Sequence, residues 1–477
     1  MGDTSSTVPI TGRTAADPRA AASPLPARPV PVGAFPLPFG FLLLPPGEEI
    51  EPVRGDLLAG RLPKQWPDGT GGLQAVLADD LDTARAAFAG TDPVSRFNRF
   101  VLDPDAVDAD ALRDSLGPEI GVLVDLVQFA AGRCDLAPDP DGHSGEIKAL
   151  LLAAVAVEGL GAPPDPPRFN PNGSAPSPAR PADLLKSAIE EARPVSPALA
   201  GVLHGALAQA CKHEGDSAGA VTALEAGIAL LADTDLAVAR AEQYLELAAT
   251  FHELAAADSS GTMASGLLNQ AVRHYHNALA AVSADSASKD SASKDSASKD
   301  STTEVWAAAH AGLGAAYLTM PMSEVSDQLR LGVAVGSLRA ALCVYTRATH
   351  PAQWSSVQLN LANALVYAPS KHQGDNLTEA VELYEAVLSA RSRDSDPVGY
   401  ARALANQGNA LAHLGMFDHA RAKLTEARFL FEEAQEWDAT ASVRGLLNEL
   451  TRNQKAASSR EDDPPSPTAK PEVPADA

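Results

Sequence analysis

The stretch ARALANQGNALAHLGMFDHARAKLTEARFL, residues 401–430, decides the fold. Apolar residues recur at helical spacing on both sides of a short break that contains Gly415. This pattern is typical of two amphipathic helices joined by a tight turn. Because each helix must bury its apolar face, the stretch predicts a helical hairpin that packs against neighbours of the same kind.

The same pattern recurs at a regular interval along the second half of the chain. Trp306, Trp354 and Tyr400 lie 48 and 46 residues apart, and each is expected to begin a helix. Small residues hold matching positions in these helices, namely Gly314, Ala362 and Gly408. One further match and one looser match lie upstream, so the sequence predicts five hairpins, beginning near residues 197, 237, 305, 354 and 399.

The quoted stretch resembles a tetratricopeptide repeat (TPR), a helical hairpin in which small residues allow close helix approach and large ones fill the gaps. The residues that carry the resemblance are Gly408, Leu411, Gly415, Phe417, Ala420, Leu424 and Ala427. The period exceeds the usual one of about 34 residues, as in the long-period arrays of large bacterial regulatory proteins. The resemblance implies an α-solenoid in which the aromatic, small and apolar residues named above pack the repeats.

Composition agrees with an all-α protein. Aromatic residues make up 5% of the 477 residues, whereas β-sheets favour aromatic and β-branched side chains. The length exceeds the roughly 250–300 residues at which a single core stops growing, so two domains or an elongated array are expected. The net charge of −24 would repel phosphate backbones and anionic lipids. Neither a nucleic acid nor a membrane is therefore an expected partner.

Shifts in composition predict the domain boundaries. Segments rich in proline or charge cannot bury enough apolar surface to become ordered, and they separate the helical regions. The expected parts are a disordered segment 1–30, an amino-terminal helical domain 31–162, a proline-rich linker 163–181, a TPR superhelix 182–452 and a disordered tail 453–477. A tandem DSASK repeat lies within the superhelix and predicts a flexible tract over 284–303.

Asparagines mark a candidate binding groove. Asn360 and Asn363 lie three residues apart on one helix face, and Asn406 and Asn409 repeat this arrangement in the next unit. The TPR resemblance implies a concave groove in which such amides, which both donate and accept, hold the backbone of a bound peptide. Arg402 lies one turn before Asn406 and suits a carboxylate of the partner. In the alternative interpretation the asparagines belong to the repeat consensus and bind only water.

No motif for catalysis, for a cofactor or for a metal is recognisable, and we expect a protein that is not an enzyme. The glycine-rich PDGTGG at 67–72, for example, lacks the GxxxxGK[ST] pattern of a phosphate-binding loop. Cys134, Cys211 and Cys343 are odd in number and far apart, which predicts neither disulfides nor a zinc site. Cys211 and Cys343 are expected to be core residues. The first thirty residues lack the features of a signal peptide, and the expected location is the cytoplasm.

The favoured function is a scaffold or adaptor that binds a segment of a protein partner in its groove. An assembly or maturation factor for a multi-subunit bacterial metalloenzyme fits the same sequence, because the carboxy-terminal repeats are similar to TPR proteins of metalloenzyme operons, uptake hydrogenases among them. An enzyme activity within the amino-terminal domain is a third alternative. The sequence predicts no particular partner and no oligomeric state.

Overall fold

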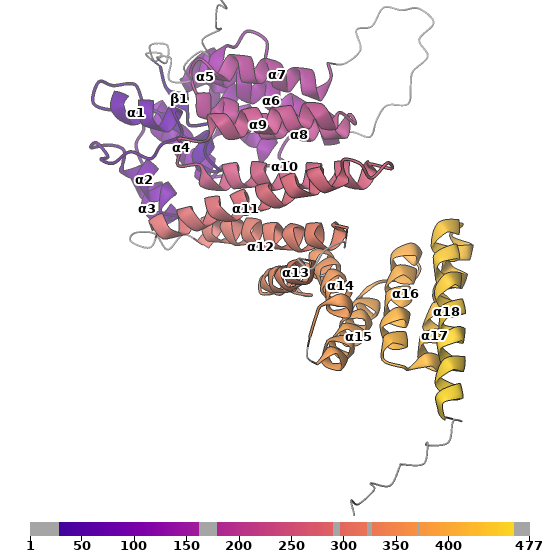
Figure 1. The fold of residues 1–477 in the computed structure, drawn as a ribbon. Coiled ribbons are helices and arrows are strands. Elements are labelled where there is room, and N and C mark those ends of the chain that lie inside the picture. Colours follow the sequence, from indigo (N-terminus) through magenta and orange to yellow (C-terminus); the bar gives the residue numbers. More distant parts are fainter. Residues whose placement is uncertain (1–27, 162–178, 290–295, 322–326, 371, 462–477) are drawn as a thin grey trace, which may run out of the picture. The chain divides into compact units, whose positions relative to one another are not determined.

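The computed structural model describes residues 28–161, 179–289, 296–321, 327–370 and 372–461 (Figure 1). Within them the chain forms eighteen α-helices, a 3₁₀-helix and two strands of two residues each, so the prediction of an all-α protein is confirmed. The elements are β1 (Val30–Pro31), η1 (Phe39–Phe41), β2 (Leu43–Leu44), α1 (Glu51–Leu58), α2 (Gly71–Leu77), α3 (Leu81–Ala87), α4 (Pro93–Leu102), α5 (Ala109–Ala130), α6 (Gly145–Gly161), α7 (Pro181–Ala192), α8 (Pro197–His213), α9 (Ser217–Leu230), α10 (Ala237–Ala257), α11 (Ala264–Lys289), α12 (Ser296–Thr319), α13 (Asp327–Leu342), α14 (Pro351–Tyr367), α15 (Gln373–Ala390), α16 (Pro397–His413), α17 (Phe417–Glu433) and α18 (Trp437–Glu461).

The chain divides into two compact units, Met1–Val305 and Trp306–Ala477. The composition predicts a boundary at 163–181, of which residues 163–178 lie outside the described part. The helices on either side of that segment, α6 and α7, pack against each other. The Ser196 hydroxyl also donates a hydrogen bond of 2.7 Å to the Leu58 carbonyl. The amino-terminal helices and the first predicted hairpins therefore share one compact unit.

An extended arm before α1 completes the core of the first unit. Strands β1 and β2 pair antiparallel, with Val30 opposite Leu44. The Asn98 side chain of α4 accepts a hydrogen bond from the Leu43 amide at 2.7 Å and donates one to its carbonyl at 3.1 Å. The side chain of Leu43 packs with those of Phe97 and Phe100. The arm is thus held both by backbone bonds and by apolar packing.

A buried arginine, a buried glutamate and the partly exposed Arg28 meet where this arm joins α1 and α6. Arg54 is fully buried and its Nη1 donates to the carbonyl oxygens of Arg28, Leu44 and Pro45, each at 3.2 Å. Arg28 Nη2 lies 3.0 Å from Oε1 of Glu146, a residue that is 1% exposed. Burial raises the pKa of the Glu146 carboxyl above its ordinary 4.5, and the charges of Arg28 and Arg54 oppose that shift.

This buried carboxyl predicts a pH dependence. Because its pKa is higher in the folded than in the unfolded protein, protonated Glu146 contributes stability below pH 4.5, and that contribution is lost as pH rises through the raised pKa. Glu146→Gln stays neutral at every pH. The free energy of unfolding of this variant, minus that of the wild type, should therefore increase as pH rises and become constant above the raised pKa. Urea unfolding at a series of pH values measures this difference.

A matched control for the Glu146 experiment is Glu119→Gln. Glu119 is the exposed partner of Arg28 at 3.0 Å, and loss of such a surface pair should change stability by about 0–1 kcal/mol. A Glu146→Gln difference that is constant with pH, or that falls as pH rises, would show that burial of this carboxylate does not disfavour its charged form.

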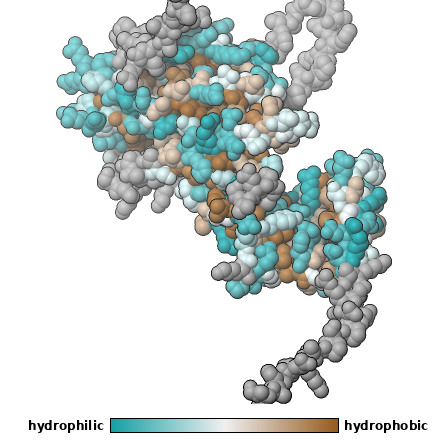
Figure 2. Space-filling view, viewed as in Figure 1, coloured by the Kyte–Doolittle hydropathy of each residue, from teal (hydrophilic) through white to brown (hydrophobic). Residues whose placement is uncertain are grey.

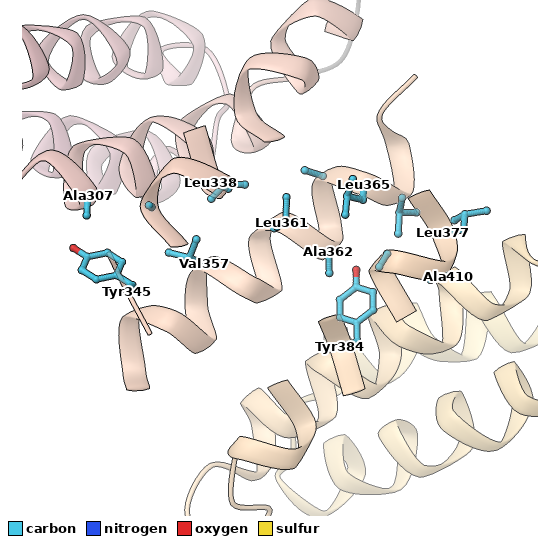
Figure 3. Packing of buried hydrophobic residues seen from close by; sticks show 14 residues of the cluster. Ala307, Leu338, Tyr345, Val357, Leu361, Ala362, Leu365, Leu377, Tyr384 and Ala410 are labelled. Atoms are coloured by element: carbon cyan, nitrogen blue, oxygen red, sulfur yellow. The ribbon is translucent and has the colours of Figure 1, made fainter. Parts of the chain in front are cut away.

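The second unit is a row of antiparallel helical hairpins, α14/α15 and α16/α17 among them, in which consecutive helices pack together (Figure 1). Figure 3 shows one core cluster, in which the ring of Tyr384 from α15 points toward α14 beside Ala362. Short side chains such as Ala307, Ala362 and Ala410 alternate in this cluster with large ones such as Leu361. This alternation allows neighbouring helices to interlock at the density of a protein interior.

Two hairpins in different units share the same local determinants. Helices α8 and α16 each span seventeen residues and begin with a proline, Pro197 or Pro397, which suits the first helical turn because no amide hydrogen is needed there. Gly215 and Gly415 follow these helices with φ of 79° and 76°. Only glycine adopts this left-handed conformation without strain. The positive φ thus explains why the sequence pattern has glycine at the turn.

Glycine also permits close helix crossings inside the hairpins. A Cβ on Gly408 would lie 2.8 Å from Cγ of Leu424, and one on Gly314 would lie 2.6 Å from Cγ of Leu338. The other residues predicted to pack the last three hairpins differ in how exposed their side chains are. Ala362, Leu411, Ala420 and Ala427 are buried, whereas Trp306, Trp354 and Tyr400 are half-buried. Helix α12 begins at Ser296, ten residues before Trp306, so the expectation that Trp306 begins a helix is wrong.

Three segments predicted to be disordered or flexible have regular structure where they are described. Residues 28–30 include the first residue of β1, helix α11 runs to Lys289 and α12 begins at Ser296, and α18 continues to Glu461. The DSASK repeat lacks glycine and proline, and its alanines and lysines favour helix, so the neighbouring helices extend into it. The same reason applies to the NQKAASSRE run that ends α18. Residues 1–27, 290–295 and 462–477 lie outside the described ranges.

Candidate partner-binding face

The candidate groove residues lie on α14 and α16, the first helices of two successive hairpins. Asn360, Asn363 and Tyr367 follow each other at helical spacing along one side of α14. On α16 the corresponding residues are Arg402, Asn406, Asn409 and His413. We call these seven residues the amide face. The four asparagines are half-buried, whereas Tyr367, Arg402 and His413 are exposed.

Hydrogen bonds join the two helices across the amide face. Asn363 Oδ1 accepts a bond of 2.9 Å from Asn406 Nδ2 and another of 2.7 Å from the hydroxyl of Tyr384. Farther along, Asn409 Nδ2 donates to the hydroxyl of Tyr367 at 3.2 Å. Burial raises the pKa of Tyr384, so its hydroxyl remains a donor at neutral pH. The seven residues of the amide face thus lie on α14 and α16, and the buried Tyr384 of α15 supports them from behind.

These bonds also fix the direction and register of the helices. Asn363 pairs with Asn406, and Tyr367, one turn later on α14, pairs with Asn409, nearly one turn later on α16. The two helices must therefore run parallel, with residues about 42 apart side by side. The same register places Arg402 opposite Asn360. All four asparagines and Arg402 thus belong to one surface.

A second set of polar groups ties α16 to the helices behind it. Gln407 is buried, and its Nε2 donates to Glu385 Oε2 of α15 at 2.8 Å. This hydrogen bond lowers the pKa of the Glu385 carboxyl, and the charge of Lys423, with Nζ at 3.5 Å, acts in the same direction. Gln407 lies on a different side of α16 from Arg402 and Asn406. The asparagines that α16 contributes to the amide face thus lie on a different side of this helix from Gln407, which holds the helix against its neighbours.

The sequence pattern identified the amides of the face but missed Tyr367 and Tyr384, the two tyrosines that bond to them. Tyr367 lies seven residues, about two helical turns, after Asn360 and was detectable from that spacing. Tyr384 lies on the second helix of the hairpin, and its contact with Asn363 depends on how the two helices cross. Within the described residues the side chains of Asn360 and Arg402 make no hydrogen bond or ion pair. The sequence pattern thus located the helices but not which amides are engaged internally.

Other features place further limits on the chemistry of the chain. Across the described ranges no three His, Cys, Asp or Glu side chains converge as metal ligands would. Cys211 is buried, but Cys343 is exposed just beyond the end of α13, so the expectation of a core position for Cys343 is wrong. A shallow hollow on α17 is lined by Arg393, Asp418, Arg421, Ala422, Thr425, Glu426 and Phe429.

Comparisons with known proteins add no family to this description. Neither a scan against protein-family models nor a search of curated proteins found a match to the chain. Among the helices that the structure describes, none combines the length and apolar character that a membrane crossing requires. In Figure 2 hydrophilic residues (teal) and hydrophobic residues (brown) both appear on the visible face.

Proposed function

We propose that the chain is a non-enzymatic adaptor of the TPR type, whose carboxy-terminal hairpins bind an extended segment of a protein partner along the amide face. The hairpin geometry and the glycine crossings support the TPR resemblance. The three cysteines are all free, which suits a reducing compartment such as the cytoplasm. The net charge of −24 argues against nucleic acid as the partner.

The observation that carries this proposal is the unused hydrogen-bonding capacity of the half-buried amides. Asn363 uses only its oxygen, and Asn406 and Asn409 use only their nitrogens, in bonds between described residues. An extended peptide backbone presents alternating donors and acceptors and needs both in return. The amide face offers both kinds along two parallel helices. An exposed aromatic ring, Tyr367 (58% exposed), lies beside them and would supply the apolar contact area that typically anchors such segments.

The test uses the full-length chain and a random twelve-residue peptide library displayed on phage. Peptides enriched on the chain are synthesised, and their Kd values are measured by titration calorimetry. Asn360→Ala/Asn409→Ala should weaken binding about tenfold or more, because two hydrogen bonds of about 1 kcal/mol each are lost. Neither substitution should unfold the chain, since Asn360 makes no internal bond and Asn409 contacts only the exposed Tyr367.

The matched control is Gln328→Ala. Gln328 is an exposed amide on α13, a second helix of its hairpin, and its replacement should leave the Kd unchanged. If no peptide is enriched, or if the double variant and Gln328→Ala bind every peptide alike, the amide face is not the binding site and the proposal fails.

A further inference from the structure

The two helices that carry the amide face, α14 and α16, contain no Asp or Glu. Helix α14 contains no charged residue, and Arg402 is the sole formal charge on α16. The second helices differ sharply. They carry Asp375, Glu379, Glu382 and Glu385 on α15 and Asp418, Glu426, Glu432 and Glu433 on α17. In a chain with 61 acidic residues and a net charge of −24, the amide face is thus a surface without fixed negative charge.

Several of the second-helix carboxylates are also committed to other partners. Glu379 pairs with Arg339 of α13 at 2.9 Å, and Glu385 is held by Gln407 and Lys423 behind α16. Glu432 pairs with Arg444 of α18 at 2.7 Å. The side chain of Arg402, in contrast, is exposed and makes neither an ion pair nor a hydrogen bond with another described residue. Its charge is therefore available to a group that arrives from solution.

We propose that the protein segment bound on the amide face is acidic, with an Asp or Glu side chain that pairs with Arg402. This inference rests on the proposed function and names the chemistry of its partner. The planar guanidinium can donate two parallel hydrogen bonds to one carboxylate, and the neutral amides beside it do not repel further acidic residues.

The same arrangement disfavours a basic segment. A Lys or Arg of the partner would lie beside Arg402 with no carboxylate on α14 or α16 to neutralise it, and like charges at close range reduce affinity. The net negative charge of the whole chain acts over longer distances. At physiological ionic strength such long-range fields are screened beyond about 8 Å, so the local composition of the face decides which sign of charge is accepted.

The first measurement repeats the peptide selection on the full-length chain and compares the composition of peptides enriched on wild type and on Arg402→Gln. Enrichment in Asp and Glu on the wild type, reduced on the variant, is expected. One enriched peptide is then synthesised with its acidic residue and with Gln in its place, and both are titrated against both proteins. The acid-to-amide change should weaken binding to the wild type about tenfold and leave binding to Arg402→Gln almost unchanged.

Arg444→Gln is the matched control, because this arginine is already paired with Glu432; it should keep the tenfold preference. Peptides that depend on Asn360 and Asn409 but are neutral or basic would overturn the acidic-partner inference and leave the proposed function standing. Peptides that bind without dependence on Asn360 and Asn409 would overturn both. If Arg402→Gln still binds the acidic peptide more tightly than its Gln form, Arg402 is not the residue that recognises the acidic side chain.

Discussion

Arg54→Ala should lower the free energy of unfolding of the amino-terminal unit by about 3–5 kcal/mol, the range found when one member of a buried charge cluster is removed. Arg54 donates to three carbonyl oxygens of the arm, those of Arg28, Leu44 and Pro45. Alanine would leave these oxygens without their donor and would leave Glu146 with Arg28 as its remaining cation. Urea unfolding gives the total loss, and amide hydrogen exchange in β2 and α1 shows where it falls.

Arg61→Ala provides the comparison for Arg54. Arg61 is also an arginine of this unit, but it is half-exposed and pairs with Asp56 at 3.0 Å on the surface. Loss of an exposed pair should change stability by about 0–1 kcal/mol. Equal losses for the two variants, or unchanged exchange rates in β2 after Arg54→Ala, would mean that Arg54 does not hold the arm in place.

Gly408→Val should destabilise the carboxy-terminal unit by about 1–3 kcal/mol or more, as overpacking typically does. A Cβ at this position would lie 2.8 Å from Cγ of Leu424 and 3.2 Å from the backbone oxygen of Ala420. The leucine can shift only at the expense of its own packing, and the backbone oxygen can shift only if α17 moves. Thermal or urea unfolding of the full chain measures the change.

Two further variants separate steric conflict from the general effect of valine in a helix. Gly445 lies in α18 and has open space around its Cβ position, so Gly445→Val should be neutral or slightly stabilising, since glycine is a poor helix former. Leu424→Ala removes the side chain that opposes Gly408. Gly408→Val/Leu424→Ala should therefore lose clearly less stability than the two single losses added together. Full additivity would contradict the crossing contact.

The sequence was most informative where local chemistry determines the structure. The apolar spacing of α16 and Gly415 locate a helix and its turn without reference to any other part of the chain, although the helix begins at Pro397, three residues before the predicted start at Tyr400. The position of the division between compact units was less accessible, because the packing of α6 on α7 and the bond from Ser196 to Leu58 join segments on either side of a proline-rich stretch. The composition of the sequence identifies the proline-rich stretch, but it does not identify these contacts.

Buried polar groups were the least predictable part of the molecule. Arg54 and Glu146 appear in the sequence as ordinary charged residues of helices, and their burial follows from how the arm folds over α1 and α6. For the amide face the helical spacing predicted a common surface for the asparagines. That Asn363 accepts from Tyr384 and Asn406 at once depends on a helix crossing, which no local pattern encodes.

The hydrogen bond between Asn363 and Asn406 has a mechanical consequence. In a row of hairpins each unit touches mainly its neighbours, so the elastic response of the row resembles that of springs joined in series. A side-chain bond that bridges α14 and α16 stiffens one of these springs without adding apolar area. Its rupture force under single-molecule extension would report how firmly the spacing of the two helices is set before any partner arrives, and a firmly set spacing reduces the ordering that binding requires.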